Sequence, residues 1–115
     1  MLAEQAVYNA IKLLAPTYPG VAPEKSPLPR IVYQQVGGAA VNYMEDTLPD
    51  ADNARVQVTC WATTPGAAAN LSKQVDQALR GIHARPIGAR TSVHEPATGL
   101  YGSMQDFNVW SKDTP

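Results

Sequence analysis

Few side chains in this 115-residue sequence could perform chemistry, and the foremost is the single cysteine. Cys60 alternates with Val56 and Val58 in the segment ARVQVTCWA. Successive residues of a strand point to opposite sides, so this alternation places all three on one apolar face. A buried cysteine behaves as a small inert hydrophobe, and a thiolate catalyst would also need a histidine beside it. The sequence therefore predicts no catalytic residue at Cys60.

The two histidines offer no metal site. His83 and His94 lie in turn-rich sequence, and Pro96 rules out the helical spacing by which two histidines of one helix chelate zinc. Gly37 and Gly38 lack the lysine and hydroxyl of a phosphate loop, and they fit a turn or bulge at a strand end. We therefore expect no catalytic residue, no metal and no cofactor.

Charged residues gather in two parts of the chain. The acidic group comprises Glu45, Asp46, Asp50 and Asp52, and the basic group comprises Arg80, Arg85 and Arg90. The acidic spacing does not match the alternating oxygen ligands of a calcium loop, which favours a solvated acidic loop. The basic group either complements a helix end and a solvated loop, or forms a patch for phosphates or an acidic partner. The sequence is consistent with both interpretations of the basic group.

Two tryptophans lie on unexpected strand faces. Trp61 and Trp110 each occupy the face opposite the clearer apolar set, among polar neighbours. A tryptophan in that position either packs under a helix or loop, or anchors a protein interface. In the second case both faces of the sheet become buried only after assembly.

Bulk composition bounds the class of protein. A formal net charge of -1 argues against non-specific binding to nucleic acid or an anionic membrane. One cysteine excludes an internal disulfide and fits a reducing cytoplasm. The chain has no apolar run of roughly 20 residues and no signal-peptide pattern. We expect a soluble intracellular protein with one domain over residues 1–115.

The N-terminal third predicts a helix, an arm and a strand. The helix is expected over residues 2–15, ending before Pro16, with a stripe of Ala3, Val7, Ala10, Ile11 and Leu14. Residues 16–30 are rich in proline and indicate an extended arm with no regular element. IVYQQVGG then reads as a strand whose inward face is ambiguous, because Ile31 and Tyr33 compete with Val32 and Val36.

The remaining core is expected within residues 31–111. Residues 39–53 form an acidic connection without periodicity, and a strand follows from residue 54. Thr64 caps a helix that begins at Pro65, continues with apolar residues at helical spacing to Ile82, and stops at a left-handed Gly81. A short strand over 90–94 and a surer one over 105–111 complete the chain. This predicts an α+β fold, with about four strands in a mainly antiparallel sheet and two helices packed against it.

The order of these segments resembles a known family. PRIVYQQVGG, NARVQVTCWATTPGAAANL, ALRGI and EPATGLYGSMQDFNVW follow one another as in the small tail completion proteins of long-tailed bacteriophages and prophages. These are similar in class to tail terminator proteins. The likeness covers residues 3–110, and its most specific pieces are RVQV with WA and QDF with VW.

The resemblance implies structural work and no catalysis. Such proteins form a ring, typically hexameric, at the head-proximal end of the tail tube, where they stop polymerisation and help to join head and tail. The implied partners are further copies of the chain, the major tail tube protein and the head-tail connector, while DNA at most passes through the lumen. The implied location is the virion tail, reached from the host cytoplasm during assembly.

Two alternatives come from other classes of function. The first is a small adaptor outside phage biology that binds one partner through the same sheet. The second is a small enzyme, which would need a pocket with convergent polar groups that the sequence does not indicate.

A ring requires two different patches that meet on neighbouring copies. We expect the acidic 39–53 loop of one copy to dock near Arg80, Arg85 or Arg90 of the next. Reversing the four carboxylates to lysine should therefore abolish ring formation or tail attachment, measured by electron microscopy. Unchanged assembly would exclude charge docking. In the alternative arrangement Arg85 and Arg90 line the lumen, so that their replacement by alanine leaves assembly intact and changes DNA retention.

Overall fold

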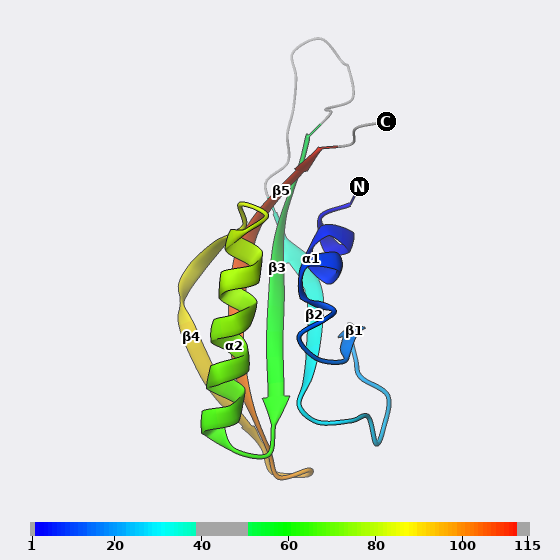
Figure 1. The fold of residues 1–115 in the computed structure, drawn as a ribbon, viewed down its shortest axis with the longest axis vertical. Helices are drawn as coiled ribbons and strands as arrows, with labels where there is room; N and C mark the ends of the chain where they lie inside the picture. Colours follow the sequence, from blue (N-terminus) through cyan, green and yellow to red (C-terminus); the bar gives the residue numbers. More distant parts are fainter. Residues whose placement is uncertain (1, 39–50, 113–115) are drawn as a thin grey trace.

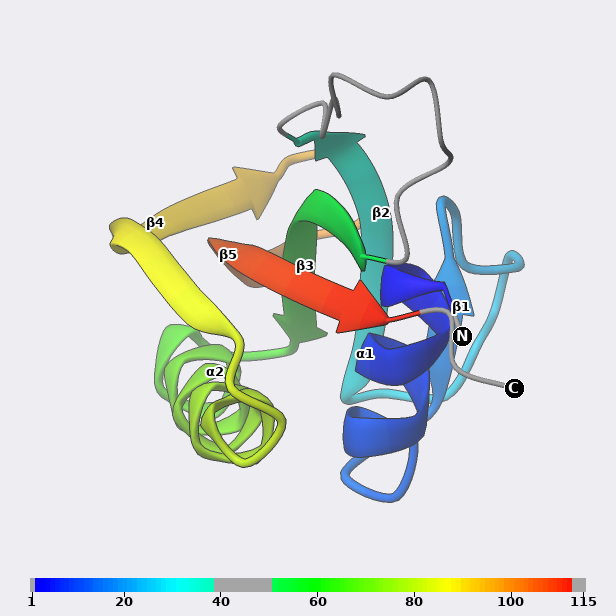
Figure 2. The same cartoon turned by 90° about the horizontal axis from the view of Figure 1, so that it is seen from above.

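The computed structural model describes residues 2–38 and 51–112, and it places two helices on one face of a five-stranded sheet (Figure 1 and Figure 2). The elements are α1 (Ala3–Ile11), β1 (Thr17–Pro19), β2 (Arg30–Gly37), β3 (Ala51–Ala62), α2 (Pro65–Arg80), β4 (Arg85–Glu95) and β5 (Leu100–Lys112). The strand order is β1-β2-β3-β5-β4, and only the β1–β2 pair is parallel. The α+β class is confirmed, with five strands where about four were expected.

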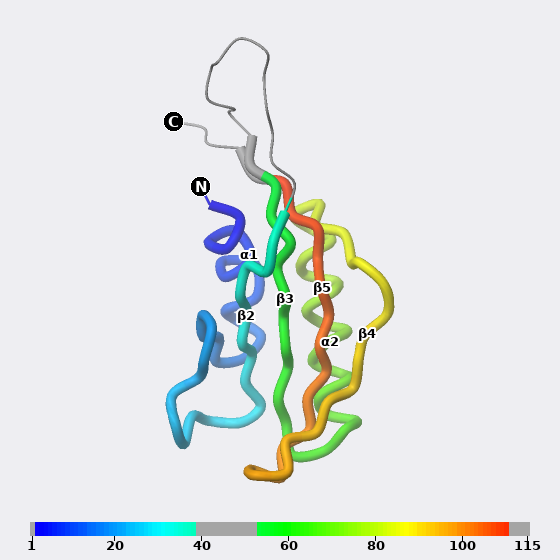
Figure 3. The backbone as a smooth tube through the Cα atoms, turned by 180° about the vertical axis from the view of Figure 1, so that it is seen from behind, coloured from blue at the N-terminus to red at the C-terminus, as the bar shows by residue number. Residues whose placement is uncertain are grey.

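The centre of the sheet is the long antiparallel pair of β3 and β5. Its register runs without a break from Ala51 opposite Lys112 to Ala62 opposite Tyr101. Both helices cover the same face of this pair. From behind, Figure 3 shows β2, β3, β5 and β4 side by side in front of the helices. We call this second side the open face, since no helix of the described residues covers it.

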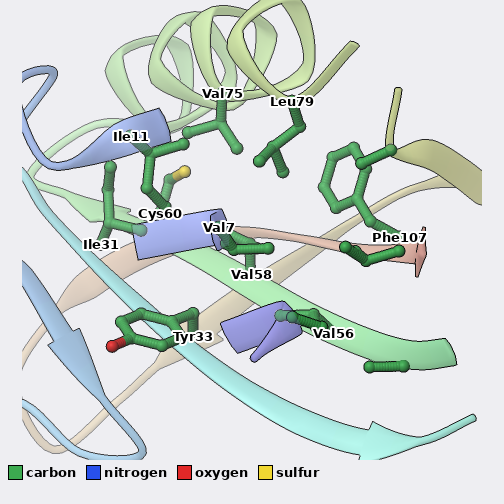
Figure 4. Packing of buried hydrophobic residues seen from close by; sticks show 14 of the residues in the cluster. Val7, Ile11, Ile31, Tyr33, Val56, Val58, Cys60, Val75, Leu79 and Phe107 are labelled. Atoms are coloured by element: carbon green, nitrogen blue, oxygen red, sulfur yellow. The ribbon is translucent and has the colours of Figure 1, made fainter. Parts of the chain in front are cut away.

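The core lies between the helices and the covered face (Figure 4). The apolar alternation in β3 is confirmed, because Val56, Val58 and Cys60 are all buried there. The helices contribute Val7, Ile11, Val75 and Leu79, and β5 contributes Phe107 and Val109. Burial of each such side chain stabilises the fold by about 1.5–3 kcal/mol.

Burial also shows which side chains of β2 point toward the core. Ile31 and Tyr33 lie in the core, Val32 is half-buried on the open face, and Val36 is 40 % exposed. The pairing of Ile31 with Cys60 and of Tyr33 with Val58 fixes this choice, since paired residues share a face.

The start of α2 is as predicted. The Ala67 N–H donates to Thr64 Oγ1 at 3.2 Å, and Pro65 occupies the first helical position. Ala68, Leu71, Val75 and Leu79 are buried along its inner stripe. The cap satisfies one of the amides that every helix start leaves without an intrahelical partner.

The end of α2 differs from the prediction. Gly81 has φ −64°, a right-handed value, and the left-handed residue is His83 with φ 65°. The Ala84 N–H donates to Leu79 O at 3.0 Å and the His83 N–H to Arg80 O at 3.0 Å. This pair of bonds is a Schellman motif, and the residues that form its outer bond, Leu79 and Ala84, are both buried in the core. Packing of Ala84 therefore outweighs the preference for glycine.

Helix α1 is shorter than expected, and the arm after it is not irregular throughout. The helix ends at Ile11, and Leu14 of the expected stripe is 37 % exposed. Within the arm, β1 pairs with β2, flanked by an Ile31 N–H bond to Pro16 O and a Gly20 N–H bond to Tyr33 O, each 2.8 Å. The many prolines of the arm hid this strand from the sequence analysis. They do not prevent it, because the pairing of β1 with β2 uses few backbone N–H groups of the arm.

The C-terminal strands are longer than predicted. Strand β4 spans Arg85–Glu95 and includes the strand expected over 90–94 with His94, and β5 already begins at Leu100, ahead of the expected residue 105. Pairing is interrupted between Ile87 and Thr91. There the buried Gln105 side chain donates to Ile87 O at 3.1 Å and to Gly88 O at 2.9 Å. The side chain thus serves carbonyls that the irregular strand leaves outside the ladder.

The left-handed conformation of His83 leads to a stability prediction. A residue with a Cβ pays roughly 1–2 kcal/mol in that region, whereas glycine does not. We expect His83→Gly to raise the free energy of unfolding by about 0.5–1 kcal/mol, measured by urea denaturation.

The matched control is Lys73→Gly, inside α2, which should lower the same quantity by about 1 kcal/mol. A loss of stability in His83→Gly would mean that the histidine side chain matters more than its backbone angle.

Candidate functional site

The two tryptophans share the open face and lie at opposite ends of it. Trp61 is paired with Gly102 and Asn53 with Trp110, so eight residues of β5 separate the two levels. At the rise of a strand this is about 27 Å. Strand alternation in the sequence predicted that both side chains lie on this face. The distance between them follows only from the register of the sheet.

Their environments differ. The Trp61 ring lies over Gly102, where an added Cβ would come within 3.0 Å of two ring carbons, and the side chain is half-buried. Trp110 is 54 % exposed. A tryptophan that is packed locally contributes to the fold, whereas an exposed one is available to a partner.

The middle of the open face is polar and internally paired. Arg55 Nη2 lies 2.6 Å from Asp106 Oδ2, and Gln57 Nε2 donates to Asp106 Oδ1 at 3.3 Å. Both oxygens of the carboxylate are therefore occupied. Sequence reasoning missed this cluster, although the polar positions of the alternating strands contained it. Such cross-strand groups stabilise pairing and do not form a catalytic dyad.

A groove borders Trp61 at one end of the open face. Its volume is about 340 Å³, and it is lined by Arg30, Val32, Trp61, Glu95 and residues 20–22 of the arm. Arg30 Nη1 donates to Ser26 O at 3.2 Å, which ties the arm to β2. Among the described residues that line the groove there is no cysteine, histidine, serine or threonine.

A smaller pocket lies on the helix-covered side, where α2 begins above β4 and β5. Its volume is about 130 Å³, and its lining includes Pro65, Arg90, Ser92, Tyr101, Gly102 and Ser103. We call it the Arg90 pocket. Its lining thus combines the exposed cation Arg90 with Ser103, a hydroxyl-bearing residue that is only 5 % exposed.

The three predicted basic residues do not form one equivalent patch. Arg80 Nε lies 3.0 Å from Asp76 Oδ1 within α2, so its charge already has a partner. Arg85 is exposed at the start of β4, and Arg90 lies within the irregular part of that strand. The acidic Glu45, Asp46 and Asp50 lie outside the described residues. The backbone of Asp52 belongs to β3, opposite Ser111.

Cys60 is 1 % exposed, and burial raises the pKa of its thiol to about 12. His83 is exposed at the end of α2. The His94 ring stacks on Tyr101 with centroids 4.5 Å apart, and its Nδ1 lies 3.1 Å from Leu100 O. Within residues 2–38 and 51–112, no hydrogen bond joins either histidine to the thiol. A protonated, enclosed thiol is not a nucleophile.

The described part of the chain contains neither a candidate metal-binding group nor a candidate membrane-spanning helix. No group of three or more histidine, cysteine, aspartate or glutamate residues in it could hold a metal ion. None of its helices has the length and apolar character needed to span a bilayer.

The described residues form an α+β domain with two helices on one sheet face and an open face opposite. The family model described as tail completion protein gp17 matches residues 2–112, and the chain belongs to this family. The family is a structural one of phage tails and not an enzyme family, and membership implies a role in the tail. A comparison with curated proteins finds no match.

The enclosed thiol gives a prediction about reactivity. At about pH 8 only on the order of one in 10⁴ of native Cys60 thiols is ionised, because the raised pKa keeps the proton on sulfur. Iodoacetamide should therefore modify the native protein at least 100-fold more slowly than the urea-unfolded chain, measured by mass spectrometry.

As a matched comparison, Thr63→Cys places a second thiol at an exposed position directly after β3. This new thiol should react at the rate of an ordinary cysteine. Equal labelling of Cys60 and of this control would contradict the enclosed thiol.

Proposed function

We propose that this protein is a tail terminator: a ring of identical copies at the head-proximal end of the tail tube that stops polymerisation and helps to join the head. Membership of the tail completion family supports the proposal. The observation that carries it is a sheet with one face under helices and the other open, with Trp110 exposed at one end.

The open face is suited to assembly. At its polar centre the Asp106 carboxylate pairs with Arg55 and accepts a hydrogen bond from Gln57. These groups therefore need no further partner, either in the free protein or in a contact. Trp110 adds a large apolar surface at one end, and tryptophan is enriched among the residues that dominate interface energies. A contact centred on Trp110 would therefore gain hydrophobic energy without burying unpaired charges.

The two ends of the face are chemically different, which a ring needs. One end carries the exposed Trp110, and the other carries the half-buried Trp61 with the groove beside it. A contact between unlike patches is heterologous, and it closes into a ring when the rotation between copies divides a full turn.

The proposed partners follow from this role. They are further copies of the chain in a hexameric ring, the major tail tube protein on one side and the head-tail connector on the other. The net charge of -1 suits a lumen through which DNA passes with weak contacts. Assembly would take place in the host cytoplasm, and the final location is the virion tail.

The test is imaging of the purified protein alone and with purified tail tubes, by negative-stain electron microscopy with co-sedimentation. We expect rings that cap one end of each tube and a limit on tube length. Tubes that bind no protein at any concentration, or that continue to grow in its presence, would contradict the proposal.

Trp110 supplies the mutational test. Trp110→Ala should change the free energy of unfolding by less than about 0.5 kcal/mol, because the side chain is 54 % exposed. Its binding to tail tubes should weaken by about 30-fold or more, the effect expected for an interface hot spot. Co-sedimentation measures binding, and urea denaturation measures stability.

The control is Leu13→Ala, another apolar side chain, 92 % exposed after α1 and away from the sheet. It should leave tube binding unchanged. If both variants bind tubes like the original protein, Trp110 is not part of the interface.

A further inference from the structure

We infer that the Arg90 pocket of one copy receives a carboxylate from residues 39–50 of a neighbouring copy. The inference rests on the proposed self-assembly and names the site of one subunit contact. The pocket lies between the start of α2 and the strands β4 and β5.

Arg90 is the cation in this pocket. Arg30 bonds to Ser26 O, Arg55 pairs with Asp106, and Arg80 pairs with Asp76. Arg90, by contrast, has no hydrogen bond or ion pair within the described ranges. Of the basic residues predicted for the interface, it is the one that lines a pocket.

Strand irregularity positions this cation. Residues 88–90 interrupt the pairing of β4 with β5, and Gly88 adopts φ +70°. Gln105 holds the irregular segment by bonding to Ile87 O and Gly88 O. Interruptions of this kind re-aim side chains at functional surfaces.

Ser103 is the second polar group. It is 5 % exposed and lines the pocket, yet its hydroxyl finds no hydrogen-bond partner among the residues that the structure describes. Among the described residues the buried side-chain nitrogen or oxygen without a partner is Arg30 Nε, so the Ser103 hydroxyl is open to the pocket and can bond to a ligand there. A ligand oxygen in the pocket would accept its proton.

The lining favours an anion. The Arg90 guanidinium offers only donors, and the Ser92 and Ser103 hydroxyls can donate to the same oxygen atoms. Pro65 places the positive end of the α2 dipole at the rim. A volume of about 130 Å³ admits one small group and is below the size of usual cofactor sites.

Charge complementarity identifies the occupant. Residues 39–50 carry Glu45, Asp46 and Asp50 and no basic side chain. A carboxylate on this segment can accept two parallel N–H bonds from a guanidinium, a geometry that gives orientation as well as energy.

Within one copy the segment would have to be almost fully extended to reach the pocket, which favours a neighbouring copy as the source of the occupant. Six residues separate Glu45 from Ala51, so its Cα reaches at most about 20 Å from that anchor. Nine residues of β3 separate Ala51 from Cys60, which is paired with Ser103, a distance of about 30 Å. Asp46 and Asp50 lie closer to the anchor still. The contact therefore joins opposite ends of two molecules and is heterologous, as a ring requires.

A peptide experiment tests the pocket without a ring. The probe is the synthetic peptide AAVNYMEDTLPD, residues 39–50, titrated into the full chain and followed by NMR. We expect chemical-shift changes at Ser103, Arg90 and Gly102. A control peptide with glutamine and asparagine in place of the three acids should bind at least tenfold more weakly, since it loses the charge-assisted bonds.

Two variants separate binding from folding. Arg90→Ala should weaken peptide binding about tenfold or more and leave stability within about 0.5 kcal/mol, because the side chain is exposed. Ser103→Ala should also weaken binding and leave stability within about 0.5 kcal/mol, because its hydroxyl faces the pocket and makes no hydrogen bond within the described residues. Equal binding of the acidic and neutral peptides, or binding unaffected by both variants, would overturn the inference.

A charge swap tests the contact in assembly. Arg90→Glu should prevent the capping of tail tubes, and changing Glu45, Asp46 and Asp50 to lysine in the same chain should restore part of it. Lys73→Glu, on the exposed side of α2, is the control that should assemble normally. Normal capping by Arg90→Glu with altered DNA retention would assign Arg90 to DNA phosphates and refute the contact. Failure of the original protein to cap tubes would refute the proposed ring, while the peptide titration still decides the pocket.

Discussion

The structure depends on the burial of one face of the β3–β5 pair under two helices. Val56, Val58, Cys60 and Phe107 all point to that side, and the stripes of α1 and α2 cover them. Because side chains alternate along a strand, a slip of one residue would turn this whole set toward water. The register of the central pair is therefore fixed by hydrophobic burial, and every surface position on the opposite face follows from it.

The same constraint produces a sheet with two unlike sides. An antiparallel sheet tolerates solvent on one face, and here that face is polar in the middle and carries tryptophan at both ends. The two edge strands also offer little regular backbone for pairing with a strand of another molecule. Strand β1 has three residues, and β4 contains Pro86 and an interruption that Gln105 supports. Contacts through side chains on the open face and at its ends are thus better supported than continuous strand pairing between copies.

The basic residues predicted for the interface differ in pairing and position. Arg80 is neutralised within its own helix by Asp76, which leaves Arg90 as the cation beside a pocket near the start of α2. Strand β3 begins at Ala51, at the end of the sheet opposite the start of α2. In the proposed ring, the Arg90 pocket and acidic residues 39–50 of a neighbouring copy would supply the two unlike patches that a head-to-tail contact needs.

The sequence by itself determined the elements whose signals are local. Alternation in β3 predicted the burial of Cys60, and Thr64 with Pro65 predicted the start of α2, because strand period and helix capping act within a few residues. The tertiary structure decided what depends on distant partners. Strand β1 forms because β2 lies beside it, His83 turns left-handed because Ala84 packs at the helix end, and Gln105 bonds to β4 across the ladder. These choices are set by free energies of packing between segments far apart in the chain, which no local pattern carries.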